Sequence, residues 1–209
     1  SIVLDISLVN DNVELVGVEV DQVGSAGHDI ITGTAALPDV IVGGPGDDVI
    51  EGISGEDILY GQDGDDQFTV DAQFKRIDGG AGIDRIELPE SVDYRTFEGL
   101  RIERIEILDL TDADADSIDL DADAIRNIVD GDNELTAINN SLVVLGNQGD
   151  VVRVFGEFLP NGLVSLDVDS SGAHTFDIFT EGDVSVLIPK TIMLEVNRAD
   201  ATVDVYGSA

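Results

Sequence analysis

Aspartate and glycine recur together in the first half of the chain at a spacing of nine residues. Residues 43–51 (GGPGDDVIE) and 79–87 (GGAGIDRIE) both fit the pattern G-G-x-G-x-D-x-U-x, in which U is a large apolar residue. The second of these begins four nine-residue repeats after the first. Near matches occupy residues 24–32, 52–60 and 61–69. A period held over this length indicates a repeat architecture.

These residue types suit a hard divalent cation. Calcium takes about 6–8 oxygen ligands, from carboxylates and main-chain carbonyls. A glycine-rich turn with one aspartate supplies both kinds, because few Cβ atoms obstruct the carbonyls and the aspartate adds negative charge. The alternative is that the aspartates are solvated turn residues of a metal-free β-solenoid, since Asp and Gly are ordinary turn formers.

Seven copies of the repeat fill residues 24–87. The second copy, 33–42, carries one extra residue, and the sixth, 70–78, has lost its glycines. Each copy places one large apolar residue inside a short predicted strand: Ile31, Ile41, Ile50, Leu59, Phe68, Ile77 and Ile86. One such residue in every nine predicts a wall whose inward side chains stack into a continuous core.

This array resembles the parallel β-roll of RTX proteins, which carry hemolysin-type calcium-binding repeats. In that family two nonapeptides make one turn of the roll, every second loop stacks, and calcium lies between stacked loops. The sixth-position aspartates and nearby loop carbonyls bind it. The resemblance implies one column of ligand positions at Asp29, Asp48, Asp66 and Asp84, and a second at Asp39, Asp57 and then Lys75. An ammonium group therefore interrupts the second column.

The resemblance also ranks the calcium sites. We expect them first between Asp48 and Asp66 and between Asp66 and Asp84, and next between Asp29 and Asp48. A site between Asp39 and Asp57 is the weakest candidate, because copy 33–42 lacks the fourth-position glycine and carries the insertion. The turn glycines expected beside the ligands are Gly43, Gly46, Gly61, Gly64, Gly79 and Gly82.

The flanking regions predict an all-β chain. Residues 1–23 alternate apolar and polar side chains around a turn signal, which favours a strand pair that caps the roll or ends an upstream domain. Residues 88–209 predict a β-rich, sandwich-like C-terminal domain of short strands, with a short helix within residues 121–129. The acidic stretch 112–123 is open to two interpretations, extra calcium ligands or a solvated acidic face.

Parts of the C-terminal region also resemble known proteins. The segments IERIEILDL, DADAIRNIVDGDNEL and VLGNQGDVVRV, within residues 101–155, are similar to the C-terminal region of large RTX adhesins secreted by type I systems. In those proteins the roll is followed by a β-rich end segment and an uncleaved C-terminal export signal. The resemblance implies a secreted bacterial protein, type I secretion machinery as a partner, and a cell-surface or glycan ligand.

Charge and composition narrow the function classes. The chain has 44 acidic and 10 basic residues and a net charge of −34, which excludes nucleic acid and anionic membrane as expected partners and favours cation binding. Without cysteine there is no disulfide framework and no thiolate metal site. No stretch is apolar enough to insert in a membrane. The first residues lack the layout of a secretory signal, which leaves open two interpretations, a fragment of a longer protein or another export route.

No catalytic motif is present. His28 and His174 are the only histidines, so an HExxH zinc helix is impossible, and G-x-S-x-G and P-loop patterns are absent. We therefore expect no enzyme, but a calcium-binding structural and secretion module of an RTX adhesin or surface protein that folds outside the cell. The alternatives are the non-catalytic tail of a secreted RTX enzyme or toxin, and a calcium-dependent glycan-binding module.

Overall fold

The computed structural model describes residues 20–71, 73–88, 91–96, 101–112, 114–169, 171–198 and 202–204. The strand pair expected within residues 1–23 lies mostly outside these ranges. Of that stretch the described part contains β1 (Gln22–Val23), which pairs parallel with β3 (Val40–Pro45) at the start of the roll.

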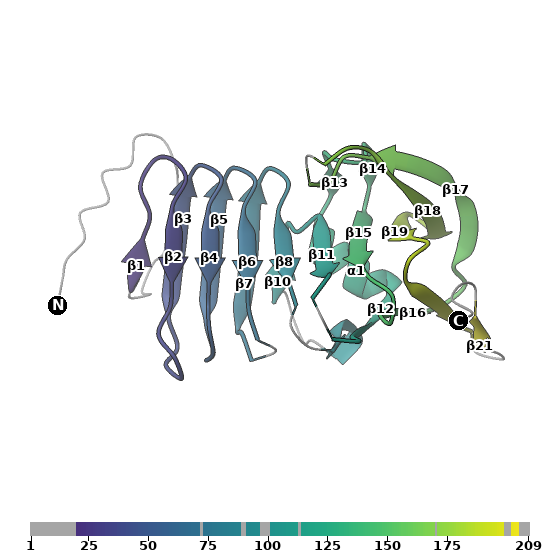
Figure 1. Cartoon of the computed structure of the whole chain (residues 1–209). Coiled ribbons are helices and arrows are strands. Elements are labelled where there is room, and N and C mark those ends of the chain that lie inside the picture. The colour runs from purple at the N-terminus through teal and green to yellow at the C-terminus, as the bar shows by residue number, and fades with distance from the viewer. Residues whose placement is uncertain are drawn as a thin grey trace.

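The repeat array forms a parallel β-roll, as the nine-residue period predicts. Its strands alternate between two sheets, so that two repeats complete one coil (Figure 1). One sheet continues from β3 through β5 (Ile58–Asp63), β7 (Arg76–Ala81) and β10 (Ile102–Glu103). The other begins with β2 (Ile30–Thr32), β4 (Val49–Glu51), β6 (Gln67–Thr69) and β8 (Arg85–Glu87).

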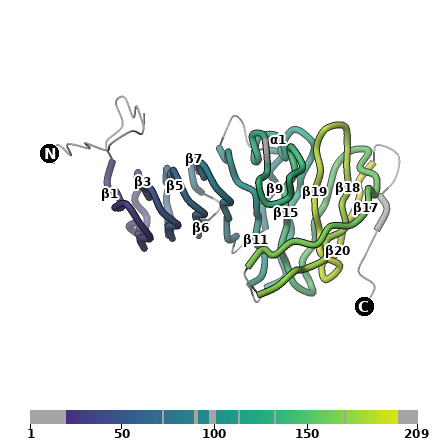
Figure 2. The backbone as a smooth tube through the Cα atoms, turned by 90° about the horizontal axis from the view of Figure 1, so that it is seen from above, coloured from purple at the N-terminus to yellow at the C-terminus, as the bar shows by residue number. Residues whose placement is uncertain are grey.

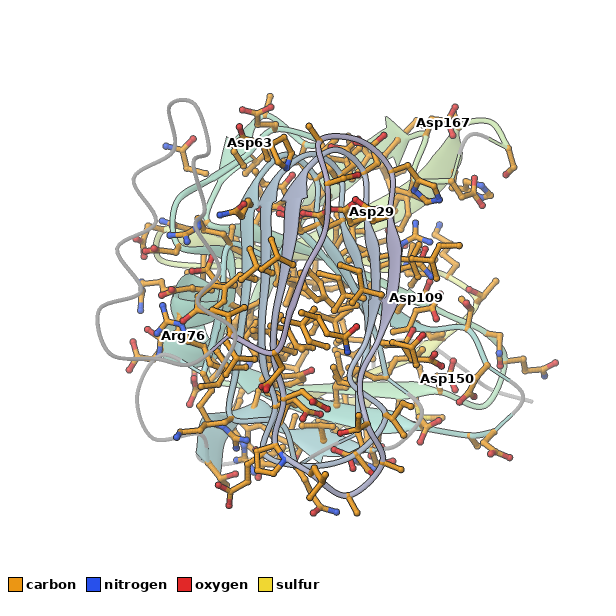
Figure 3. The ribbon with its side chains drawn as sticks, turned by 90° about the vertical axis from the view of Figure 1, so that its left-hand side faces the viewer. Asp29, Asp63, Arg76, Asp109, Asp150 and Asp167 are labelled. Atoms are coloured by element: carbon orange, nitrogen blue, oxygen red, sulfur yellow. The ribbon has the colours of Figure 1, made fainter. Side chains whose placement is uncertain are left out.

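The predicted apolar series forms the core between these two sheets. Ile31, Ile50, Phe68 and Ile86 pair along one sheet, and Ile41, Leu59 and Ile77 pair along the other. All seven are buried, which confirms the inward position given by the repeat. Figure 3 looks along the roll and shows side chains filling the space between the sheets, with Arg76 and Asp109 on opposite outer faces.

The C-terminal region is β-rich, and its architecture refines the sandwich-like expectation. Its first strands continue the sheet of β8 in parallel register: β11 (Ile107–Leu110), β15 (Ser141–Gly146) and β19 (Val184–Pro189). The antiparallel strands β18 (His174–Glu181) and β17 (Leu159–Leu166) complete this nine-stranded sheet. Figure 2 shows the narrow roll widening into these larger coils.

A second sheet closes the larger coils. It contains β9 (Val92–Asp93), β12 (Ser117–Asp121), β16 (Val151–Phe155), β20 (Met193–Asn197) and β21 (Thr202–Asp204). The first four pair in parallel, and β21 is antiparallel to β20. The two sheets face each other as in a sandwich, but the chain winds through them as a solenoid. The η1 turn (Tyr94–Thr96) follows β9, and β13 (Asp132–Asn133) pairs with β14 (Ile138–Asn139).

The helix expected within residues 121–129 is present as α1 (Ala122–Val129). The side chain of Asp121 accepts a hydrogen bond from the Ala124 N–H at 2.8 Å, as an N-cap residue does. The apolar face of α1 is buried and packs on β10, β15 and β19. In the ranges given above, no helix is long and apolar enough to cross a membrane.

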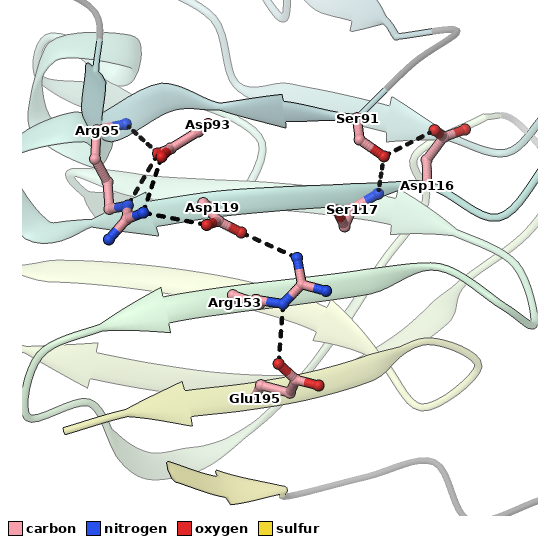
Figure 4. Close-up of polar contacts among 8 residues, drawn as sticks. All are labelled: Ser91, Asp93, Arg95, Asp116, Ser117, Asp119, Arg153 and Glu195. Atoms are coloured by element: carbon pink, nitrogen blue, oxygen red, sulfur yellow. Dashed lines mark hydrogen bonds and ion pairs between the residues drawn. The ribbon is translucent and has the colours of Figure 1, made fainter. Parts of the chain in front are cut away.

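Arginines neutralise acidic side chains across the second sheet. Arg153 on β16 bridges Asp119 on β12 and Glu195 on β20, so opposite charges alternate across these three strands (Figure 4). Arg95, in the η1 turn, bridges Asp119 and Asp93, which lie opposite each other on β12 and β9. Opposite charges at neighbouring positions of a sheet stabilise the pairing. The acids at the turns of the roll have a different environment.

Candidate metal centre

Four aspartates stack along one edge of the roll, at the turns that join the two sheets. We call Asp29, Asp48, Asp66 and Asp84 the aspartate column. The main-chain N–H of each donates to the Oδ1 atom of the next: Asp29 to Asp48 at 2.8 Å, Asp48 to Asp66 at 2.7 Å, and Asp66 to Asp84 at 2.8 Å. The parallel register of β2, β4, β6 and β8 brings them together, because each aspartate directly precedes one of these four strands.

The second carboxylate oxygen of three of these aspartates has no protein partner. Asp48, Asp66 and Asp84 are 1%, 1% and 0% exposed, and their Oδ2 atoms are buried without a hydrogen bond. A buried carboxylate oxygen in this state carries a large desolvation penalty unless a cation or a donor reaches it. The three orphaned oxygens therefore point to a ligand.

Each orphaned oxygen faces a main-chain carbonyl of the next coil. A Cβ atom added to Gly43 would lie 2.5 Å from Asp48 Oδ2 and 2.9 Å from the carbonyl oxygen of Gly61. The same construction at Gly61 meets Asp66 Oδ2 and the carbonyl oxygen of Gly79. Two oxygens from successive coils thus converge on the space that the missing side chains leave open. Oxygen ligands of these two kinds are those calcium prefers.

The aspartate column is electrostatically unfavourable in the absence of a cation. Burial raises the pKa of Asp48, and it raises the pKa of Asp66 to about 7 and that of Asp84 to about 9. The negative charges of neighbouring acids add to each shift, against the lowering effect of the main-chain hydrogen bond to the carboxylate.

Comparison with known proteins identifies the repeat. Residues 37–68 match the family model of the RTX calcium-binding nonapeptide repeat, in four copies. These residues are RTX repeats. RTX nonapeptide repeats bind calcium, so the matched loops, which contain Asp48 and Asp66, have a known ligand. No curated protein and no solved structure matches the chain significantly.

The flanking loops share the RTX geometry to different degrees. The loop that ends in Asp84 lies outside the matched residues, yet it has both the main-chain ladder and the orphaned oxygen. At the other end, the Oδ2 atom of Asp29 accepts hydrogen bonds from the N–H and the hydroxyl of Ser25, at 2.6 and 2.9 Å. The Oδ2 atom of Asp29 is therefore satisfied by its own loop.

The second column departs from the RTX pattern, as the sequence indicates. The Asp39 N–H donates to Asp57 Oδ1 at 2.9 Å, so the ladder begins in the same way. The Oδ2 atom of Asp39, however, accepts from the N–H and hydroxyl of Thr34. In the next coil Lys75 is exposed and Phe74 is buried in the turn. Hydrogen-bond donors and apolar packing stabilise this edge of the roll, whereas the aspartate column has buried carboxylate oxygens without a partner.

The structure adds a residue that the nine-residue period missed. The Asp84 N–H donates to Glu106 Oε2 at 2.8 Å, so a glutamate continues the ladder beyond the RTX loops. Glu106 follows Asp84 by 22 residues instead of 18, and a search for the period passes over it. Among the described residues, no group of three or more His, Asp or Glu side chains is arranged to hold a metal. A cation in the roll would need main-chain carbonyls as ligands in addition to carboxylates.

The acidic stretch 112–123 divides between surface and interior. Asp112 and Asp114 are exposed, which agrees with a solvated acidic face. Asp116 is buried, and its N–H donates to Asp150 Oδ1 at 3.1 Å, as in the roll. Both oxygens of Asp150 accept main-chain hydrogen bonds, from Asp116 and from Asn147, so Asp150 resembles Asp29 in being satisfied by protein donors.

His174 lies at an exposed turn beside Ser171 and Asp169. Its Nε2 atom is 3.0 Å from the Ser171 hydroxyl and 3.3 Å from Asp169 Oδ1. A nucleophilic triad needs the serine on one ring nitrogen and the carboxylate on the other. Because both contacts involve Nε2, this group does not have the geometry of a triad.

Proposed function

We propose that this chain is a calcium-binding structural and secretion module of a secreted bacterial RTX adhesin or surface protein, and that its roll folds outside the cell. The observation that carries the proposal is the set of three buried Oδ2 atoms without protein partners, at Asp48, Asp66 and Asp84. Each faces a carbonyl of the adjoining coil. The RTX match supports calcium as the cation.

The carboxylates oppose folding in the absence of a cation. Stacking places like charges one above another at a buried edge, and the chain as a whole carries a net charge of −34. Calcium, when bound, supplies positive charge to oxygens that otherwise lose their hydration. Extracellular calcium modules have dissociation constants of about 10⁻⁴–10⁻³ M. Each site then adds on the order of 1 kcal/mol at millimolar calcium.

This thermodynamic balance suits export before folding. At low cytosolic calcium the acidic chain stays expanded, which favours passage through a narrow exporter, and the orphaned oxygens favour folding where calcium is abundant. The similarity of residues 101–155 to the end region of RTX adhesins supports a type I secretion system as the partner and the bacterial surface as the location. We propose no catalytic role, and the contacts of His174 support that view.

Calcium binding to Asp66→Asn tests the proposal. The substitution removes one charge, while the remaining amide oxygen can still accept the Asp48 N–H. We expect Asp66→Asn to bind fewer calcium ions by isothermal titration calorimetry, with binding about tenfold weaker, because ligand charge sets the affinity of such sites. Asp63→Asn makes the same change at an exposed position of the same loop and serves as the matched control.

The two variants separate site binding from general charge effects. Equal losses in Asp63→Asn and Asp66→Asn would show that calcium responds to net charge alone. Wild-type protein that binds no calcium at millimolar concentration would refute the proposal altogether.

A further inference from the structure

We propose that the metal column continues one coil beyond the RTX repeats, at a calcium site formed by Asp84 and the turn at residues 104–106. This inference rests on the proposed function. It adds a calcium site that takes part of its ligands from residues 104–106, a segment with no glycine-aspartate repeat.

The main-chain ladder at this turn repeats that of the preceding coil. The Asp84 N–H donates to Glu106 Oε2 at 2.8 Å, as the Asp66 N–H donates to Asp84 Oδ1 at 2.8 Å. In return, the Asp84 carbonyl accepts from the Ile107 N–H at 3.0 Å, as the Asp66 carbonyl accepts from Arg85. The strand after the turn, β11, then pairs in parallel with β8. Glu106 therefore occupies the column position that an aspartate occupies in the RTX loops.

A carbonyl also takes the place of the missing glycine loop. A Cβ atom added to Gly79 would meet Asp84 Oδ2 and the carbonyl oxygen of Arg104. At Gly61 the equivalent neighbours are Asp66 Oδ2 and the carbonyl oxygen of Gly79. The same pair of oxygens, one carboxylate and one carbonyl from the next coil, converges in both places.

The carboxylate at this position has no protein cation to neutralise it. Asp84 is fully buried, its Oδ2 atom has no hydrogen bond, and Glu106 is 4% exposed. In the described ranges neither of these acids forms an ion pair. The side chain of Arg104 pairs with Asp78, so only its carbonyl faces Asp84, and the side chain of Arg85 pairs with Asp109. A buried, orphaned oxygen opposite a carbonyl matches the other two positions of the column.

A cation here would connect the roll to the larger coils. Asp84 precedes β8, the last strand of the repeats, and Glu106 precedes β11, the next strand of the same sheet. Calcium held between them would couple the order of the first C-terminal coil to that of the roll.

A crystal structure of the whole chain grown in calcium tests the site directly, because anomalous scattering locates the ions. We expect a peak within about 2.3–2.6 Å of both Asp84 Oδ2 and the Arg104 carbonyl oxygen. Peaks beside Asp48 and Asp66 with none beside Asp84 would overturn this inference alone. No peak along the column would instead contradict the proposed function.

A charge-neutral variant tests the site in solution. Glu106→Gln keeps an acceptor for the Asp84 N–H and removes the charge, so we expect it to bind one calcium ion fewer than wild type in equilibrium dialysis. Glu51→Gln makes the same change on the exposed face of β4 and should bind the wild-type number. A Glu106→Gln protein with wild-type stoichiometry and affinity would overturn the inference.

Discussion

At the scale of single residues, the two oxygens of each column aspartate have separate functions. Oδ1 accepts a main-chain N–H from the preceding coil and so fixes the side chain, while Oδ2 of Asp48, Asp66 and Asp84 stays unpaired and buried. The loop of Asp29 shows the contrast, because the N–H and the hydroxyl of Ser25 both donate to its Oδ2 atom, the oxygen that is unpaired in the other three aspartates. Within the column, the second oxygen therefore distinguishes Asp48, Asp66 and Asp84 from Asp29.

The raised pKa values predict how the calcium-free protein responds to pH. The pKa of Asp66 and that of Glu106 are raised to about 7, and that of Asp84 to about 9, chiefly by burial. The folded state then binds more protons than the unfolded state between about pH 4 and these values, so the stability that protonation provides is lost as the pH rises. We expect the β-sheet signal of the protein in EDTA, followed by far-UV circular dichroism, to decrease as the pH is raised from 5 to 8.5.

Asp84→Asn is the control for this pH dependence. It removes the carboxylic acid whose pKa is raised furthest, so its β-sheet signal should decrease less steeply over the same range. A wild-type β-sheet signal that increases with pH in EDTA would contradict the assignment of buried, unneutralised acids.

Residue types and their spacing predict most of the aspartate column, but not what happens at its two ends. The aspartate column, its preferred members and the break at Lys75 follow from the repeat and its family. The satisfaction of Asp29 by Ser25 could not be predicted, because it depends on the shape of one loop. Glu106 could not be predicted, because it follows Asp84 by 22 residues and the connection is longer than two repeats. Only the pairing of β8 with β11 in the structure shows that the two acids lie in one column.

At the scale of elements, the glycine-rich loops determine how closely successive coils approach. Gly64 has a positive φ of 130°, and a Cβ atom there would clash with the carbonyl oxygen of Gly46 in the preceding loop. Gly27 has a similar φ of 144°, but nothing lies within 4 Å of its absent Cβ. Comparing these two glycines therefore distinguishes the effect of backbone strain from the effect of close packing between loops.

Alanine at these two glycines should therefore have unequal effects. We expect Gly64→Ala to lower the free energy of unfolding of the calcium-loaded protein by about 2–4 kcal/mol, from strain plus the clash between coils. Gly27→Ala should cost only about 1 kcal/mol, from strain. Equal losses in chemical denaturation would show that the loops do not pack as closely as described.

At the scale of the whole molecule, one sheet runs from the repeats into the C-terminal region. The strands β8, β11, β15 and β19 pair in a single parallel ladder (Figure 1). One hydrophobic core extends from Ile31 to Val196. The nine-residue period predicted only the first part of this solenoid. The later coils have no repeat in sequence, because their turns contain α1 and long hairpins of differing length.

This continuity predicts that calcium affects more than the repeats. The amides of β11 hydrogen-bond to β8, so their protection from hydrogen exchange depends on an ordered roll edge. We expect calcium to slow exchange at Ile107–Leu110 as well as within residues 24–87. Slower exchange confined to residues 24–87 would show that the two parts fold independently.

The central claim is that calcium makes the roll fold, and far-UV circular dichroism during a calcium titration of the EDTA-treated protein tests it most directly. The orphaned oxygens of Asp48, Asp66 and Asp84 predict a cooperative gain of β signal near millimolar calcium, with little response to equal magnesium, which keeps its own waters. A spectrum that is already that of a folded β protein in EDTA and does not change with calcium would contradict the account.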